Sequence, residues 1–147
     1  MKKAHVFILT VLLISAALPG FTACRPVEPI YPIEPHVLLL SPSYGSTFSP
    51  GPITVHAYVE SVNLVDKAGQ PNVPGEGHLI YYLDVNPPVV TGITATTASG
   101  TFVTSTKLSY TWPQVGSGEH ILAVQLVNND NTPMRAPSAS WIKITVK

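Results

Sequence analysis

The stretch "ITVHAYVE" at residues 53–60 decides the fold, because apolar and polar residues alternate along it without a break. Its apolar positions are Ile53, Val55, Ala57 and Val59. Successive side chains of a β-strand point to opposite faces, so this period of two predicts a strand with one buried and one exposed face. An amphipathic helix would need apolar residues three and four positions apart, and the stretch lacks that spacing.

Similar alternation recurs from residue 37 to the end of the chain. Strands are expected at residues 37–40, 53–60, 78–85, 101–104, 107–112, 121–126 and 141–146. Segments rich in turn-forming residues separate them, such as "SPGP" at 49–52 and "NNDNTP" at 128–133. About seven short strands predict an all-β domain over residues 37–147, a single immunoglobulin-like antiparallel β-sandwich, with a small barrel as the alternative.

Residues 1–23 have the pattern of a signal peptide. Lys2 and Lys3 precede an uncharged apolar run at residues 6–18, which is shorter than the roughly 20 residues that span a bilayer. The only cysteine, Cys24, comes next, and a lone cysteine has no partner for a disulfide within the chain. The string "FTAC" at 21–24 resembles the lipobox of bacterial lipoproteins, although leucine is more usual at its first place.

The lipobox resemblance implies that Cys24 carries a diacylglycerol and becomes the first residue of the mature chain. Two acyl chains, such as palmitate, give the stable attachment that one chain does not. The resemblance therefore predicts a lipoprotein anchored to the cell membrane on its extracytoplasmic face. The alternatives are an ordinary secretory signal cleaved near Ala23 and an uncleaved anchor helix.

Residues 24–36 read as a proline-rich linker between the anchor and the sandwich. Its prolines are Pro26, Pro29, Pro32 and Pro35, one at every third position. This is the period of a polyproline II helix, and proline also keeps the residue before it extended. Eleven residues at about 3.1 Å each give a semi-rigid spacer of roughly 34 Å.

The charge of the chain excludes one class of partner. Six cationic and eight acidic residues follow the signal peptide, for a net charge of −2. Nucleic acid is therefore not expected as a partner, because binding to phosphates needs a cationic surface.

Three blocks of sequence carry a family resemblance: "NLVDKAGQPNVPGEGHLIYYLDV" at 63–85, "SYTWPQVGSGEHILAVQLVNNDNTP" at 109–133 and "WIKITV" at 141–146. They resemble an uncharacterised prokaryotic family of small secreted or lipid-anchored domains, for which immunoglobulin-like sandwiches are expected. The resemblance implies Gly-His-x-His in the first block and Asp-His-Thr-Pro in the last loop. This chain has Ile80 in place of the second histidine of the first pattern and Asn131 in place of the histidine of the second. The resemblance supports the fold and implies no activity.

Histidine suggests a metal site, because imidazole is a common ligand of zinc and copper. Antiparallel pairing of 78–85 with 121–126 places His78 near Asp130 at one end and His120 near Asp84 at the other, roughly 25 Å apart at 3.3 Å per residue. A zinc or copper site would use His78, Asp130 and Glu76, although a closed zinc site needs four ligands. The alternative is that both histidines bond to loop atoms.

No sequence pattern indicates an enzyme, since Gly-x-Ser-x-Gly, His-Glu-x-x-His, phosphate-loop and dinucleotide-binding motifs are absent from the sequence. No cofactor is expected either.

Tyr58, Tyr82 and Trp141 occupy positions opposite the expected core, and exposed aromatic side chains suit contacts with a sugar or a protein. Residues 86–105 form a long connection of the kind that often binds ligands.

The sequence therefore predicts a cell-surface lipoprotein with a binding or adhesion module of unknown ligand, whose partner is an envelope protein or a glycan. Two alternatives stay open. One is a metal-handling envelope protein that uses His78 and Asp130. The other is a structural component of the cell envelope without a small ligand.

Overall fold

The computed structural model describes residues 34–135 and 138–147. The predictions for the signal peptide, for Cys24 and for the linker up to residue 33 lie outside these residues. Pro32–Lys147 forms one compact unit. In the described ranges, no helix has the length and apolar character needed to cross a bilayer.

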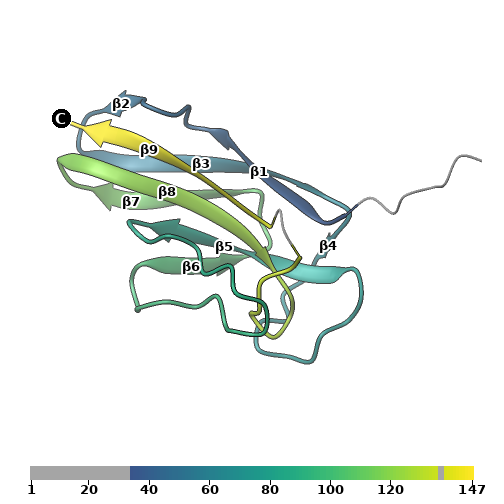
Figure 1. The fold of residues 1–147 in the computed structure, drawn as a ribbon. Coiled ribbons are helices and arrows are strands. Elements are labelled where there is room, and N and C mark those ends of the chain that lie inside the picture. Colours follow the sequence, from purple (N-terminus) through teal and green to yellow (C-terminus); the bar gives the residue numbers. More distant parts are fainter. Residues whose placement is uncertain (1–33, 136–137) are drawn as a thin grey trace, which may run out of the picture. The chain divides into compact units, whose positions relative to one another are not determined.

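The described residues form nine strands in two sheets (Figure 1). The three-stranded sheet has the order β1 (His36–Ser41), β3 (Gly51–Glu60), β7 (Ser109–Val115). The six-stranded sheet has the order β2 (Thr47–Phe48), β9 (Ala139–Val146), β8 (Gly118–Val127), β5 (Glu76–Leu83), β4 (Asn63–Leu64), and β6 (Phe102–Ser105) also pairs with β5. All pairs of longer strands are antiparallel, whereas the two-residue strands β2 and β4 pair in parallel.

This order is that of an immunoglobulin-like β-sandwich, so the predicted fold class is confirmed. Each of the seven predicted strands is present, and the pairing of β5 with β8 follows the predicted register, with His78 opposite Val127. The strands β2 and β4 were not predicted, because two residues are too few to show a period of two. The pairing in two separate sheets excludes the small barrel.

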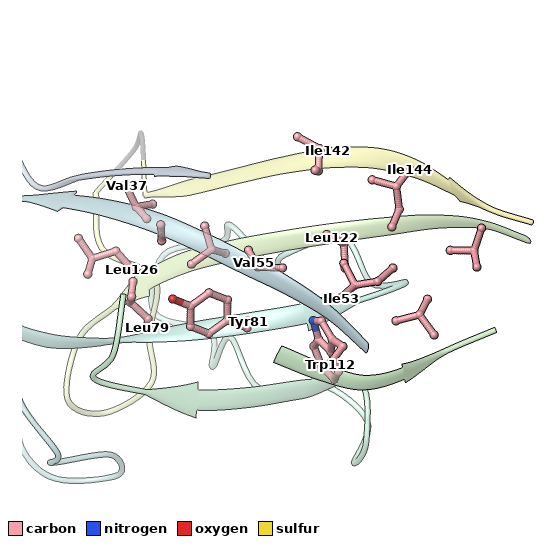
Figure 2. Close-up of a cluster of buried hydrophobic side chains, with 14 of the residues drawn as sticks. Val37, Ile53, Val55, Leu79, Tyr81, Trp112, Leu122, Leu126, Ile142 and Ile144 are labelled. Carbon is pink, nitrogen blue, oxygen red and sulfur yellow. The ribbon is translucent and has the colours of Figure 1, made fainter. Parts of the chain in front are cut away.

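The core lies between the two sheets and is built from the alternating positions (Figure 2). In β3, Ile53 and Val55 are buried, whereas Thr54 and His56 are exposed. The members of this cluster labelled in Figure 2 are Val37, Ile53, Val55, Leu79, Tyr81, Trp112, Leu122, Leu126, Ile142 and Ile144. Each buried apolar side chain of this size contributes about 1.5–3 kcal/mol, so the fold holds together without a disulfide.

A second, smaller cluster lies on the outer face of the six-stranded sheet. Ile80 and Tyr82 of β5 join Ala123 and Val127 of β8, and Ala95 of the β5–β6 connection covers them. Because both faces of β5 and β8 are covered in this region, these strands are buried along most of their length. The β5–β6 connection therefore acts as a layer of the fold.

A buried network holds this connection to the sheet. The Tyr82 hydroxyl lies 2.8 Å from the Ala95 carbonyl and 2.7 Å from Gln125 Oε1, and Gln125 Nε2 donates to the Pro88 carbonyl at 2.6 Å. Tyr82 has no exposed surface. The prediction that Tyr82 is an exposed contact for a ligand is therefore wrong: its position is on the outer face, as expected, but a folded connection covers that face.

The sandwich has two ends, which differ in what they carry. At the tether end, β1 begins opposite the end of β3, and the β4–β5 loop (65–75) meets the β8–β9 loop (128–138) (Figure 1). At the far end lie the β7–β8 turn and the C-terminus. We name this end the tether end because β1 starts there at His36, directly after the predicted linker in the sequence.

Candidate functional site

The two loops at the tether end bond directly to each other. Gly69 N donates to the Asn129 carbonyl at 2.7 Å. Asn72 and Asp130 exchange two bonds, from Asp130 N to Asn72 Oδ1 at 2.9 Å and from Asn72 Nδ2 to Asp130 Oδ2 at 2.8 Å. Asn72 belongs to the string "PNVPGEGH" at 71–78, and Asn129 and Asp130 belong to "QLVNND" at 125–130, within the two blocks that carry the family resemblance. In this structure, the role of both strings is to lock the two loops together.

Glu76 lies within this loop cluster and is fully engaged. Its carboxylate accepts from Lys67 Nζ at 2.8 Å and from Asn129 Nδ2 at 3.3 Å. The hydrogen bond from Lys67, supported by that from Asn129, lowers the pKa of Glu76 below its ordinary value. Glu76 therefore stays ionised and pairs with a lysine of its own loop.

His78 is almost completely buried at the start of β5, with 2% of its surface exposed. Its Nε2 lies 3.0 Å from Asn131 Oδ1, and its Nδ1 has no hydrogen-bond partner. Desolvation lowers the pKa of His78 and outweighs the Asn131 bond and the charge of Asp66, so the ring is neutral near pH 7. The Asn131 carbonyl accepts from Ala95 N at 2.7 Å, which ties the β5–β6 connection to the same cluster.

The structure does not assemble His78, Asp130 and Glu76 as metal ligands. Asp130 Oδ1 accepts from Thr132 N at 2.9 Å and from Thr132 Oγ1 at 2.6 Å, and its other oxygen bonds to Asn72. The Thr132 hydroxyl is the main cause that lowers the pKa of Asp130. Within 34–135 and 138–147, no group of three His, Cys, Asp or Glu residues is placed to hold a metal ion.

His120 lies at the far end beside Asp84, as the strand pairing predicted. His120 Nδ1 is 2.9 Å from Asp84 Oδ2, and Nε2 is 2.9 Å from the Gly116 carbonyl. Both neighbours are acceptors, so both bonds form together only when the ring carries two protons. Desolvation works to lower the pKa of His120, but the bonds to Asp84 and Gly116 and the charge of Asp84 raise it above its ordinary value.

The His120–Asp84 pair resembles part of a catalytic triad, but its geometry is structural. In a triad, the second ring nitrogen accepts the proton of a nucleophile. Here that nitrogen bonds to a main-chain carbonyl, and Asp84 Oδ1 accepts from Ile121 N at 3.0 Å. The pair therefore fixes the start of β8 against the end of β5.

Two adjacent hollows lie on the outer surface near the far end. One of about 290 Å³ is lined by Asp84, Glu119, His120, Ile121 and Lys143, and one of about 170 Å³ lies between the β1–β2 turn, the start of β8 and residues 143–145 of β9. Glu119 and Lys143 line both. Two exposed aromatic side chains lie beside the hollows. Tyr44 lines the smaller one, and Trp141 lies two positions before Lys143 on β9, opposite Ala123 near the middle of β8. We call this region the far-end surface.

The predicted strip of Tyr58, Tyr82 and Trp141 does not exist as one surface. Tyr58 is exposed beside Leu38 on the outer face of the three-stranded sheet, Trp141 is exposed on the six-stranded sheet, and Tyr82 is buried. Sequence reasoning missed Tyr44, Glu119 and Lys143. Tyr44 lies in the β1–β2 turn, where no periodicity marks a face, and only the parallel pairing of β2 with β9 brings it to this surface.

No protein-family model matches the chain, and no curated protein is similar to it in sequence. Among solved structures, the chain is similar to a fibronectin(III)-like module of Clostridium thermocellum CbhA, with 17% identity, a TM-score of 0.48 and coverage of 76% of this chain and 96% of that one. It is also similar to the PKD domain of human KIAA0319, with 15% identity, a TM-score of 0.38 and coverage of 89% and 92%. These likenesses are distant, and no function passes from them to this chain.

Proposed function

We propose that the chain is a lipoprotein of the prokaryotic cell surface whose β-sandwich is a binding module on the extracytoplasmic face of the membrane. The observation that carries the proposal is the placement of the only cysteine. Cys24 ends a lipobox-like string and stands 12 positions before the first strand, which begins at His36. A lipid on Cys24 would therefore attach the sandwich at its tether end.

The two ends of the sandwich support a binding role rather than metal handling. At the tether end, the side chains of Glu76 and Asp130 are bonded to residues of the β4–β5 and β8–β9 loops. At the far end, the surface carries exposed aromatic and charged side chains around two hollows. The free binding groups thus lie on the outer surface of the six-stranded sheet, away from the end at which β1 begins.

Mass spectrometry of the protein extracted from membranes of an expressing bacterium tests the anchor. We expect a chain that begins at Cys24 and carries a diacylglyceryl group and, in Cys24→Ser, a protein that is no longer lipid-modified or firmly membrane-bound. Gly116→Ala is the matched control, because it lies at the far end and should leave membrane attachment unchanged. A free thiol at Cys24, or equal membrane binding of Cys24→Ser, would overturn the proposal.

A structural component of the envelope without a ligand is the second candidate. If the chain is such a component, substitutions in the far-end surface should not change how much of the protein associates with cell-wall material. The next inference gives the binding experiment that separates the two candidates.

A further inference from the structure

The far-end surface combines three features on neighbouring strands. Trp141 has 53% of its surface exposed and Tyr44 has 69%. Lys143 lies close to both, because it follows Trp141 by two positions on the same face of β9 and its carbonyl accepts from Gly45 N at 2.8 Å. Glu119 of β8 pairs with Thr145 of β9, and Glu119 lines both hollows together with Lys143. Aromatic rings and hydrogen-bonding groups therefore alternate over a small area.

The charges of this surface balance locally. Asp84 and Glu119 are negative, Lys143 is positive, and the two acceptors around His120 hold that ring in its protonated form at mildly acidic pH. A surface with both signs in equal number does not select a polyanion such as nucleic acid or teichoic-type phosphate polymers. It complements a ligand that carries many hydroxyl groups and no net charge.

The same surface is a poor match for a protein partner. The centre of a stable protein interface is a contiguous apolar patch from which charges are depleted. Here Lys143 lies two positions from Trp141 and lines the same hollow as Tyr44, and the larger hollow is lined mainly by charged side chains. Sugar rings have the complementary pattern, since one face carries apolar C–H groups that stack on an aromatic ring while the edge carries hydroxyls.

We propose that the far-end surface binds an uncharged polysaccharide, with sugar rings stacked on Trp141 and Tyr44 and hydroxyl groups bonded to Lys143 and Glu119. This inference rests on the proposed function, because a lipid at the tether end directs this surface away from the membrane toward the wall or matrix. The His120–Asp84 pair acts as a positioning element that fixes the start of β8, and with it Glu119.

The binding test uses residues 25–147, which contain the nine strands of the described residues and both buried clusters. The probes are the tetrasaccharides of β-1,4-linked glucose and of β-1,4-linked N-acetylglucosamine, measured by calorimetry. We expect binding of at least one probe, and a weakening of about tenfold in Trp141→Ala, which corresponds to 1.4 kcal/mol. Tyr58→Ala is the matched control, since Tyr58 is 44% exposed on the other sheet and should change affinity less than about twofold.

A second readout uses the wild-type chain. The sequence has two tryptophans, of which Trp112 is 5% exposed in the core and Trp141 is on the proposed site. A bound sugar should shield Trp141 from the quencher acrylamide, and the shielding should be absent in Trp141→Phe. The proposal is overturned if neither tetrasaccharide binds, or if Trp141→Ala and Tyr58→Ala lose affinity equally. Neither outcome depends on the lipid anchor, so a failure here is distinguishable from a failure at Cys24.

Discussion

The two ends of the sandwich carry similar residue types, but they differ in how many of the polar side chains are bonded within the protein. At the tether end, the side chains of Asn72 and Asp130 bond the two loops to each other, and those of Asn129 and Asn131 bond to Glu76 and His78 at the start of β5. The polar side chains of that end thus hold the loops together. At the far end, one pair, His120 with Asp84, holds the strand ends, and other charged side chains face solvent. A polar loop residue is therefore a candidate for ligand binding only if its side chain is not already hydrogen-bonded within the protein.

The difference in packing between the ends gives the largest expected effect. A Cβ added to Gly77 at the tether end would overlap the Val127 carbonyl and the Met134 side chain, whereas one added to Gly116 at the far end meets no atom within 4 Å. We expect Gly77→Ala to lower the free energy of unfolding by about 3 kcal/mol, because the backbone of β8 cannot move aside. Urea denaturation measures this loss.

Gly116→Ala is the control for that change, with an expected effect within about 0.5 kcal/mol. Equal losses in the two variants would contradict the claim that the ends differ in packing.

The next effect concerns the connection that joins the two ends over the outer face. Tyr82→Phe removes a buried hydroxyl that is shared by the Ala95 carbonyl and Gln125. We expect a loss of about 1–3 kcal/mol, because buried acceptors remain without a donor. Amide exchange in residues 86–101 should accelerate as the connection loosens.

Tyr58→Phe provides the comparison for Tyr82→Phe, since Tyr58 is exposed and its hydroxyl has no buried partner. Its stability should equal that of the wild type within about 0.5 kcal/mol. If both variants behaved alike, the buried network would not be what holds the connection.

The two histidines predict opposite responses of the two ends to pH. The pKa of His120 is raised in the folded protein, so its stabilising contribution is complete below the unfolded value of 6.5 and is lost as the pH rises through the folded pKa. The pKa of His78 is lowered, so its contribution is present above 6.5 and is lost as the pH falls through the folded pKa. Acidification should loosen the tether end and tighten the far end.

Hydrogen exchange between pH 5 and pH 8, corrected for the intrinsic pH dependence of exchange, measures both responses. Groups near the histidines contribute as well: Asp66 and Lys107 line the hollow beside His78, and Asp84, Glu119 and Lys143 line the hollow beside His120. His120→Gln should abolish the response of the far end and leave that of the tether end. A common direction at both ends would refute the assignment of the two ring states.

The smallest expected effect on stability is that of Trp141→Ala, although Trp141 has the largest predicted role in binding. Trp141→Ala should change the free energy of unfolding by less than about 0.5 kcal/mol, because more than half of the side chain is exposed. Its thermal midpoint should match that of the wild type. A large loss would show that Trp141 is a packing residue, and its role in binding would need another probe.

Alternation of apolar and polar residues was sufficient to predict the seven main strands, the fold class and the positions of His78 and His120 at opposite ends. It failed for Tyr82, because the pattern places a residue on a face but does not show that a connection of 18 residues, 84–101, folds over that face. It failed for Tyr44 because a turn has no period, so only strand pairing shows which sheet it joins.

The central claim is that the lipid anchor holds the tether end near the membrane and leaves the far-end surface directed away from it. Energy transfer to acceptor-labelled lipid headgroups tests this directly, with donors attached to Gln70→Cys at the tether end or Gly116→Cys at the far end of the vesicle-bound lipoprotein. The ends are separated by roughly 33 Å, the length of the ten-residue strand β8. The account predicts stronger transfer from position 70; equal transfer from both positions, or stronger transfer from position 116, would contradict it.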